Sequence, residues 1–281
     1  MSHLNNNTKQ VGRPKKNFTV KPIPKVVTDI NDAQITTKTF IVYFLEYDIM
    51  PNSDDWFDAI QIDSEIKCGS IVSKTKTNTN FFKNCFSCVV YDEFLNKVNI
   101  KICKNGTFQL TGCKHWKSCS FCVVKLLKYS RVSKVKLIIR PVMCNIKFYI
   151  GKQININNAL VFFNEEYNHP FFAYKINKSP ALNIKSPIEQ QDFENINMHV
   201  IDYDAKRSST ALHHMTIKNY IEQYVVSTKD LVKMKKPRFN SIMLFRSGNC
   251  IISGINKESM VLIFNKFLDL VNSMEMQRSA A

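Results

Sequence analysis

The chain has 281 residues, with 39 Lys and Arg against 23 Asp and Glu, which gives a formal net charge of +16 at pH 7. Hydrophobic residues make up 44%, and only 7 Gly and 9 Pro are present, so disordered, fibrous and collagen-like chains are excluded. The positive charge favours a polyanionic partner, either nucleic acid or an anionic membrane surface. A basic protein without such a partner is the alternative.

The sequence carries no sign of export. It has no apolar run long enough to span a membrane, and its first 30 residues lack the apolar core of a secretory signal. The nine Cys are an odd number and follow no disulfide framework. We therefore expect an intracellular, reducing environment.

Residues 1–37 are polar and predict a basic, flexible N-terminal arm. Within it, Gly12-Arg13-Pro14-Lys15-Lys16 has the core of an AT-hook, in which Arg13, Lys15 and Lys16 would contact a narrow minor groove. A generic cationic tail is the alternative reading of this segment. A strand at 39–45 and a short helix at 52–60 are expected next.

The segment from residue 85 to residue 129 has the clearest secondary-structure pattern. It predicts a strand at 85–91, an alternating strand at 98–104, a tight turn at Asn105-Gly106, a return strand at 107–111 and a helix at 114–129. Further strands are expected at 136–139, 144–150 and 171–176, with a helix at 155–166. Residues 179–236 are interpreted as an insertion, helical at 208–233.

The same strand, hairpin and helix pattern returns near the C-terminus. A strand at 239–245, a turn at Arg246-Ser247-Gly248, a return strand at 249–253 and a helix at 257–274 follow in the same order once Gly106 is set on Gly248. An internal duplication is therefore predicted. Chance similarity between common structural parts is the alternative.

These two segments resemble the repeats of the TATA-box-binding protein family. The resemblance is carried by Leu110-Thr111-Gly112-Cys113-Lys114, Leu244-Phe245-Arg246-Ser247-Gly248 and Ile252-Ser253-Gly254, and Cys144-Asn145-Ile146-Lys147 is similar to the Gln-Asn-Ile-Val that opens each family repeat. The divergence, and an amino-acid composition that fits an AT-rich genome, are most similar to the TATA-binding-like proteins of large nucleocytoplasmic DNA viruses.

The resemblance implies an α+β fold in which two tandem repeats, 38–134 and 135–281, form one curved antiparallel sheet, a saddle with helices on its convex side. The insertion at about 179–236 would lie in the second repeat. It also implies a monomer with internal pseudo-two-fold symmetry, located in the host cytoplasm (the viral factory), the nucleus or the virion.

The implied function is that of a transcription-initiation factor. Such a protein covers the minor groove of AT-rich duplex DNA with its concave sheet, wedges Phe side chains between base steps, and recruits a TFIIB-like factor or a viral RNA polymerase. Two alternatives are a module with this fold that binds proteins instead of DNA, and a DNA-packaging protein without sequence preference.

The resemblance also implies DNA-contacting residues. Asn145 falls on the base-reading Asn, Thr111 and Ser253 on the groove-contacting Thr, and Phe245 and Phe86 on wedge positions; the counterpart of Phe86 would be Phe171 or Phe172. An ordinary core Phe is the alternative for Phe245. Strand alternation adds Met243, Ile251, Gln109 and Lys101 to the same face. That face is more polar in the first copy, where Cys103 stands at the wedge position.

No catalytic constellation is recognisable, so we expect neither an enzyme nor a cofactor. Cys85-x-x-Cys88 and Cys119-x-x-Cys122 have the ligand count of a zinc site. Their positions inside a strand and a helix favour ordinary buried thiols, and no metal is expected. The His213-His214 pair lies beside no candidate nucleophile, and Asp202 with Asp204 reads as a solvated polar loop.

Overall fold

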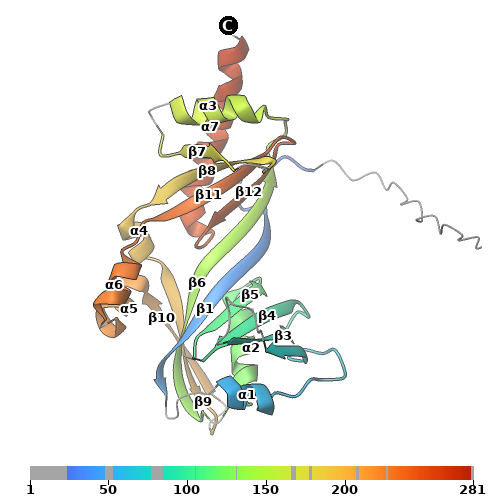
Figure 1. The fold of residues 1–281 in the computed structure, drawn as a ribbon, viewed down its shortest axis with the longest axis vertical. Coiled ribbons are helices and arrows are strands. Elements are labelled where there is room, and N and C mark those ends of the chain that lie inside the picture. Colours follow the sequence, from blue (N-terminus) through green and yellow to red (C-terminus); the bar gives the residue numbers. More distant parts are fainter. Residues whose placement is uncertain are drawn as a thin grey trace, which may run out of the picture.

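The computed structural model describes residues 24–47, 53–76, 85–104, 106–130, 132–165, 169–176, 179–206, 209–225 and 227–279. The described strands form one 12-stranded sheet, and the neighbouring strands in it are antiparallel. Figure 1 shows an upper and a lower half joined by two long, twisted strands, β1 and β6. In these residues no helix is long and apolar enough to cross a membrane.

Each half contains the same elements in the same order. The first half consists of β1 (Gln34–Tyr47), α1 (Ser53–Ala59), β2 (Ile71–Lys76), β3 (Cys85–Tyr91), β4 (Lys97–Cys103), β5 (Phe108–Cys113) and α2 (Trp116–Leu127). The second consists of β6 (Lys134–Tyr149), α3 (Ile156–Glu165), β7 (Phe172–Lys175), β8 (Ala181–Ile188), β11 (Arg238–Phe245), β12 (Asn249–Gly254), the 3-10 turn η1 (Glu258–Met260) and α7 (Val261–Ser279). The strand order β2-β3-β4-β5-β1-β6-β12-β11-β8-β7 is therefore symmetric about the β1–β6 pair.

The pairing of β1 with β6 shows that this symmetry extends to individual residues. Lys38 pairs with Cys144, and each residue pair on one side of this central pair has an equivalent residue pair on the other side. The matching pairs are Thr37↔Asn145 with Thr39↔Met143, Ile35↔Ile146 with Phe40↔Pro141, and Gln34↔Lys147 with Ile41↔Arg140. A register shift lies between Ile35 and Thr37 and another between Thr39 and Phe40, so even the bulges are related by the pseudo-two-fold axis.

The hairpins that follow obey the same symmetry. Thr111 pairs with Asn99 in the first half, and Ser253 pairs with Ser241 in the second. The turn glycines Gly106 and Gly248 have φ of 75° and 79°, the left-handed conformation that a residue without Cβ adopts at least cost. The expected fold class, α+β with two repeats in one antiparallel sheet, is confirmed.

Each half has its own core beneath its own helices. In the first, Ile100 and Leu110 pack under α2 residues such as Val123. In the second, Phe148 packs edge-to-face with Phe264 of α7 at 4.9 Å. Because α2 and α7 cover the same side of the sheet, side chains that alternate with the core residues lie on the other side.

The predicted insertion begins later than expected. Residues 181–188, assigned to it from the sequence, form β8 and pair with β11 over eight residues, so β8 belongs to the sheet of the second repeat. The insertion contains α4 (Gln190–Glu194), β9 (Asn197–Asp204), β10 (Ser209–Thr216), α5 (Ile217–Tyr224) and α6 (Thr228–Met234). The helix predicted over 208–233 is wrong in its first part, where β10 pairs with β9.

The insertion occupies the place of a short turn. In the first half, β3 and β4 are joined by residues 92–96, where the Asp92 carboxylate accepts hydrogen bonds from the backbone N–H of Phe94 and Asn96. In the second half the chain instead leaves β8, adds β9 to the edge of β6 opposite Lys134–Ile139, and returns to β11.

The predicted arm is also too long. Val27 and Ile30 are buried in the second core, and the Val27 N–H donates to the Tyr149 carbonyl at 3.0 Å. β1 begins at Gln34, so the prediction that residues 24–37 belong to a flexible arm is wrong. Arg13, Lys15 and Lys16 lie outside the described residues.

Candidate nucleic-acid interface

The side of the sheet turned away from α2 and α7 carries a distinct set of side chains, which we call the open face. On β11 and β12, Met243, Phe245 and Ile251 are half-exposed, and they alternate with buried Ile242 and Ile252. Asn145 and Ser253 are directly opposite each other on β6 and β12 of the same face. The structure thus brings together the second-half residues that the sequence placed on this face.

Polar atoms without partners lie along the open face. Thr39 Oγ1, Asn145 Oδ1 and Asn183 Nδ2 are each buried without a hydrogen-bond partner in the described part of the chain. Thr39 pairs with Thr111 and Asn183 with Met243, which places both on this face. A buried polar group without a partner costs about 1–3 kcal/mol, and a ligand that supplies the missing hydrogen bond recovers that cost.

The first half of the open face is more polar. Asn99, Lys101, Gln109 and Thr111 lie on it, with Lys101 opposite Gln109. Cys103 occupies the position equivalent to Phe245, and its Sγ lies 2.6 Å from that of Cys85 on the neighbouring strand. Burial, together with the hydrogen bond to Cys85, raises the pKa of the Cys103 thiol to about 12, so it is protonated at neutral pH.

Phe86 does not lie on the open face. It is 3% exposed, belongs to the first core and meets Phe57 of α1 edge-to-face at 5.4 Å. Its neighbours Cys85 and Ser87 point to the open face instead, because side chains alternate along a strand. The placement of Phe86 as a wedge is therefore wrong.

The expected counterpart of Phe86 is wrong as well. The pairing of β8 with β11 and of β3 with β4 makes Leu182, which is also buried, equivalent to Phe86. Of the two candidates, Phe171 is buried in the second core, whereas Phe172 is 42% exposed and pairs with Lys185 on the open face.

Sequence reasoning missed an aromatic cluster at the outer edge of the second half. The ring centroids of Phe172 and Phe239 are 5.7 Å apart in an edge-to-face arrangement, and those of Phe172 and Tyr174 are 6.5 Å apart. The Lys185 Nζ lies over the Tyr174 and Phe239 rings. Phe239 is 41% exposed. It continues the alternation of Ser241, Met243 and Phe245, so the period-2 pattern of β11 was the signal that pointed to it.

The insertion lies on the same side as the open face. Its core packs against Tyr43, Leu45 and Ile138, which alternate with the first-core residues Val42, Phe44 and Leu137. Tyr220 of α5 stacks on Tyr43 with ring centroids 6.4 Å apart. One end of the face is therefore covered by the insertion and the rest is left open.

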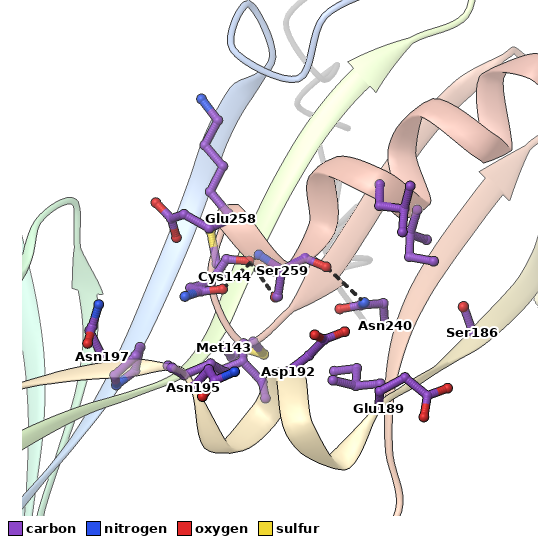
Figure 2. A pocket seen from close by; sticks show the side chains of 18 of the residues that line it. Met143, Cys144, Ser186, Glu189, Asp192, Asn195, Asn197, Asn240, Glu258 and Ser259 are labelled. Atoms are coloured by element: carbon purple, nitrogen blue, oxygen red, sulfur yellow. Dashed lines mark hydrogen bonds between the residues drawn. The ribbon is translucent and has the colours of Figure 1, made fainter. Parts of the chain in front are cut away.

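A hollow of about 840 Å³ lies between α4 and the beginning of α7 (Figure 2). Asn240 donates from Nδ2 to the Ser259 carbonyl at 3.3 Å, and Glu189, Asp192 and Glu258 line the same space. Lys38, Lys257 and Lys266 also line it, so its lining mixes both charges. No described cluster of three or more His, Cys, Asp or Glu could hold a metal ion.

Two histidines of β9 and β10 also have partners within the protein. His213 Nε2 lies 3.2 Å from Asp202 across the β9–β10 hairpin, with both side chains partly exposed. Trp116 stacks on His199 at 4.1 Å. Burial, reinforced by the nearby His214, lowers the pKa of His199 to about 4. His199 is therefore neutral at physiological pH.

Fold and open face together define an α+β protein of two pseudo-symmetric repeats, with α2 and α7 on one side of the sheet and, on the other side, an open face that the insertion covers at one end. The chain is 36% identical over 299 residues to "Uncharacterized protein 335L" of Invertebrate iridescent virus 6, an alignment that covers 91% of this chain and 89% of the viral protein. The chain belongs to the family of that viral protein. No protein-family model matches the present chain. A solved structure of Methanococcus jannaschii TBP aligns with a TM-score of 0.46 and 12% identity, over 86% of this chain and 98% of that one.

Proposed function

We propose that this protein is a viral, TATA-binding-like transcription-initiation factor that holds AT-rich duplex DNA in the minor groove against its open face. The observation that carries the proposal is the presence of two unpartnered donor groups on the open face, the Thr39 hydroxyl and the Asn183 Nδ2, set among half-exposed apolar side chains. By the resemblance of its repeats, the helical side would recruit a TFIIB-like factor or a viral RNA polymerase.

The chemistry of the open face suits an A·T-rich minor groove. The groove presents acceptors, adenine N3 and thymine O2, whereas a G·C pair adds the guanine amine as a donor. Hydroxyl and carboxamide groups can donate to those acceptors, and apolar side chains such as Met243 and Ile251 can lie against the sugars and base edges. The net charge of +16 adds attraction to the phosphates.

Fluorescence anisotropy with matched AT-rich and GC-rich duplexes across a salt series tests the proposal. We expect a clear AT preference that persists at moderate salt. A steep salt dependence without preference would instead indicate a packaging protein. No binding by a chain that lacks residues 1–23 would favour a protein-binding module, the alternative suggested by the polar first half and by Cys103 at a wedge position.

A further inference from the structure

A basic hollow of about 500 Å³ lies where the insertion meets the second half of the open face. Arg140 of β6, Lys185 of β8 and Arg238 of β11 line it. The hydroxyl-bearing residues Ser241 and Ser253 line the same space. No Asp or Glu is among its described lining residues, so three cations share one space without a carboxylate in it.

The two guanidinium groups are held in place by neutral partners. Arg140 donates from one terminal nitrogen to the Tyr43 hydroxyl at 2.9 Å, and the other lies 3.5 Å from the Met234 sulfur. Its Nε is buried and has no hydrogen-bond partner within the described ranges. The guanidinium carbon of Arg238 lies 3.5 Å from the centre of the Phe193 ring, and one of its terminal nitrogens donates to the Met234 carbonyl at 2.7 Å.

These contacts orient the cations and leave their charge uncompensated. Arg140 and Arg238 line the same hollow, and like charges repel. Burial, and then the positive charge of Arg140, lower the pKa of Arg238. A bound anion removes that repulsion. Guanidinium forks match phosphate oxygens in geometry.

The basic hollow exists in one half only. Through the registers of the two halves, the positions equivalent to Arg140, Lys185 and Arg238 are Gln34, Val89 and Asn96, none of which is charged. Phe193, which supports Arg238, comes from the insertion and has no counterpart in the 92–96 turn. The hollow is therefore one place at which the insertion breaks the pseudo-two-fold symmetry on the open face.

We propose that the basic hollow binds one backbone phosphate of the duplex and so fixes the direction in which the protein lies on its DNA site. This inference rests on the proposed function. Because a pseudo-two-fold axis relates the strands of the two halves, the open face can be placed on a duplex in either direction, and only features that differ between the halves can favour one of them. A phosphate site in one half makes the two directions unequal, and a directional complex lets the protein mark the direction of transcription.

The first test uses the full chain, an AT-rich duplex and a salt series. Lys185→Gln removes one cation whose Nζ lies over the Tyr174 and Phe239 rings, so the fold should persist. Lys128→Gln, at the exposed C-terminal cap of α2 on the helical side, is the matched control. We expect the slope of log affinity against log salt to fall by about 0.9 in Lys185→Gln, the loss for one phosphate contact, and to stay unchanged in Lys128→Gln.

The second test measures direction. A donor fluorophore attached enzymatically at the C-terminus, beyond α7 of the second half, is paired with an acceptor at either end of the duplex. We expect unequal energy transfer to the two ends for the parent protein, and more nearly equal transfer for Lys185→Gln and for Arg140→Gln. If Arg140→Gln lowers the melting temperature, Lys185→Gln still decides the result.

The outcomes separate the two proposals. A parent protein without AT preference contradicts the proposed function. A parent that prefers AT-rich DNA, while Lys185→Gln keeps its salt slope and its direction, contradicts the basic hollow alone. Inorganic phosphate at matched ionic strength tests the other source of this chemistry. If phosphate raises the melting temperature of the parent but not of Lys185→Gln, and DNA binding is equal in both, the hollow binds a free anion and the duplex assignment is overturned.

Discussion

Thr39 and Asn145 occupy the same position in the two halves of the sheet, one opposite Thr111 on β5 and the other opposite Ser253 on β12. Each has a buried side-chain oxygen without a partner in the described part of the chain, and Thr39 is only 4% exposed. The equivalence follows from the register around Lys38 and Cys144. The two halves thus present related but chemically different polar groups at the centre of the open face.

This pair leads to a first prediction. Thr39→Val keeps the shape and removes the hydroxyl, and Asn145→Ala removes the carboxamide. We expect either change to weaken binding of an AT-rich duplex about tenfold, because a good base contact is worth roughly 1–3 kcal/mol. We expect Thr39→Val to leave the free energy of unfolding unchanged or higher, because it removes an unpartnered polar group. Anisotropy and urea unfolding measure the two effects; unchanged affinity in both variants would count against the interface.

A second prediction concerns bending. Phe245 is half-exposed on the open face and Cys103 stands at the equivalent position in the first half, so Phe245→Ala should reduce the bend of bound DNA more than Cys103→Ala does. The bend is measured by energy transfer between the two duplex ends.

Phe86→Ala is the control for Phe245→Ala. It removes a core ring, so it should lower the free energy of unfolding by about 3–5 kcal/mol and leave the bend of the folded complex unchanged. Equal bending by the parent, Phe245→Ala and Cys103→Ala would remove the wedge assignment.

A third prediction compares the two turn glycines. Gly106 and Gly248 share a left-handed φ near +77°, so Ala strains the backbone equally at both. The surroundings differ: an added Cβ would lie 3.2 Å from the Phe44 ring at Gly106, but would overlap the Lys152 carbonyl oxygen at Gly248. We expect Gly106→Ala to cost about 1 kcal/mol and Gly248→Ala to cost at least about 1–3 kcal/mol more. Equal melting temperatures for the two variants would contradict the close approach at Gly248.

A fourth prediction concerns pH. Burial lowers the pKa of His199 to about 4 from 6.5, so the unfolded chain takes up this proton first as pH falls. The stability associated with neutral His199 is present above pH 6.5 and is lost progressively between pH 6.5 and 4. His199→Phe keeps an aromatic ring against Trp116 and cannot titrate. Urea unfolding at pH 7 and pH 5 should therefore show a smaller loss of stability in His199→Phe; an equal loss would exclude His199 as the source.

Particular elements show what could be read from the sequence. The alternation in β11 and β12 predicted the open-face positions of Met243, Phe245 and Ile251, because period-2 patterning identifies the two faces of a strand. Matching Phe86 to a family wedge assigned the side chains of β3 to the wrong faces of the sheet. A shift of one residue moves a side chain to the other face, and the alternation of Cys85, Ser87 and Val89 was the better guide.

The insertion was misjudged for a different reason. Pro187 is disfavoured inside a strand that has neighbours on both sides, but it lies beyond Lys185, where the pairing of β8 with β7 ends. Pro is tolerated where a strand has a neighbour on one side only. β10 was predicted as helix, although its partner β9 is its neighbour in the sequence. The hairpin of β9 and β10 is fixed in place by the attachment of β9 to β6, a contact between segments far apart in the sequence.

The sequence by itself determined the duplicated hairpin-and-helix unit, the two apolar cores and the polar character of the first copy, because these follow from local periodicity and turn chemistry. Only the tertiary structure decided the pairing of Lys38 with Cys144, and hence which residues are equivalent in the two halves. It alone brought Arg140, Lys185 and Arg238 together from three strands. Strand register and the meeting of distant cations depend on non-local packing, which leaves no periodic signal in the chain.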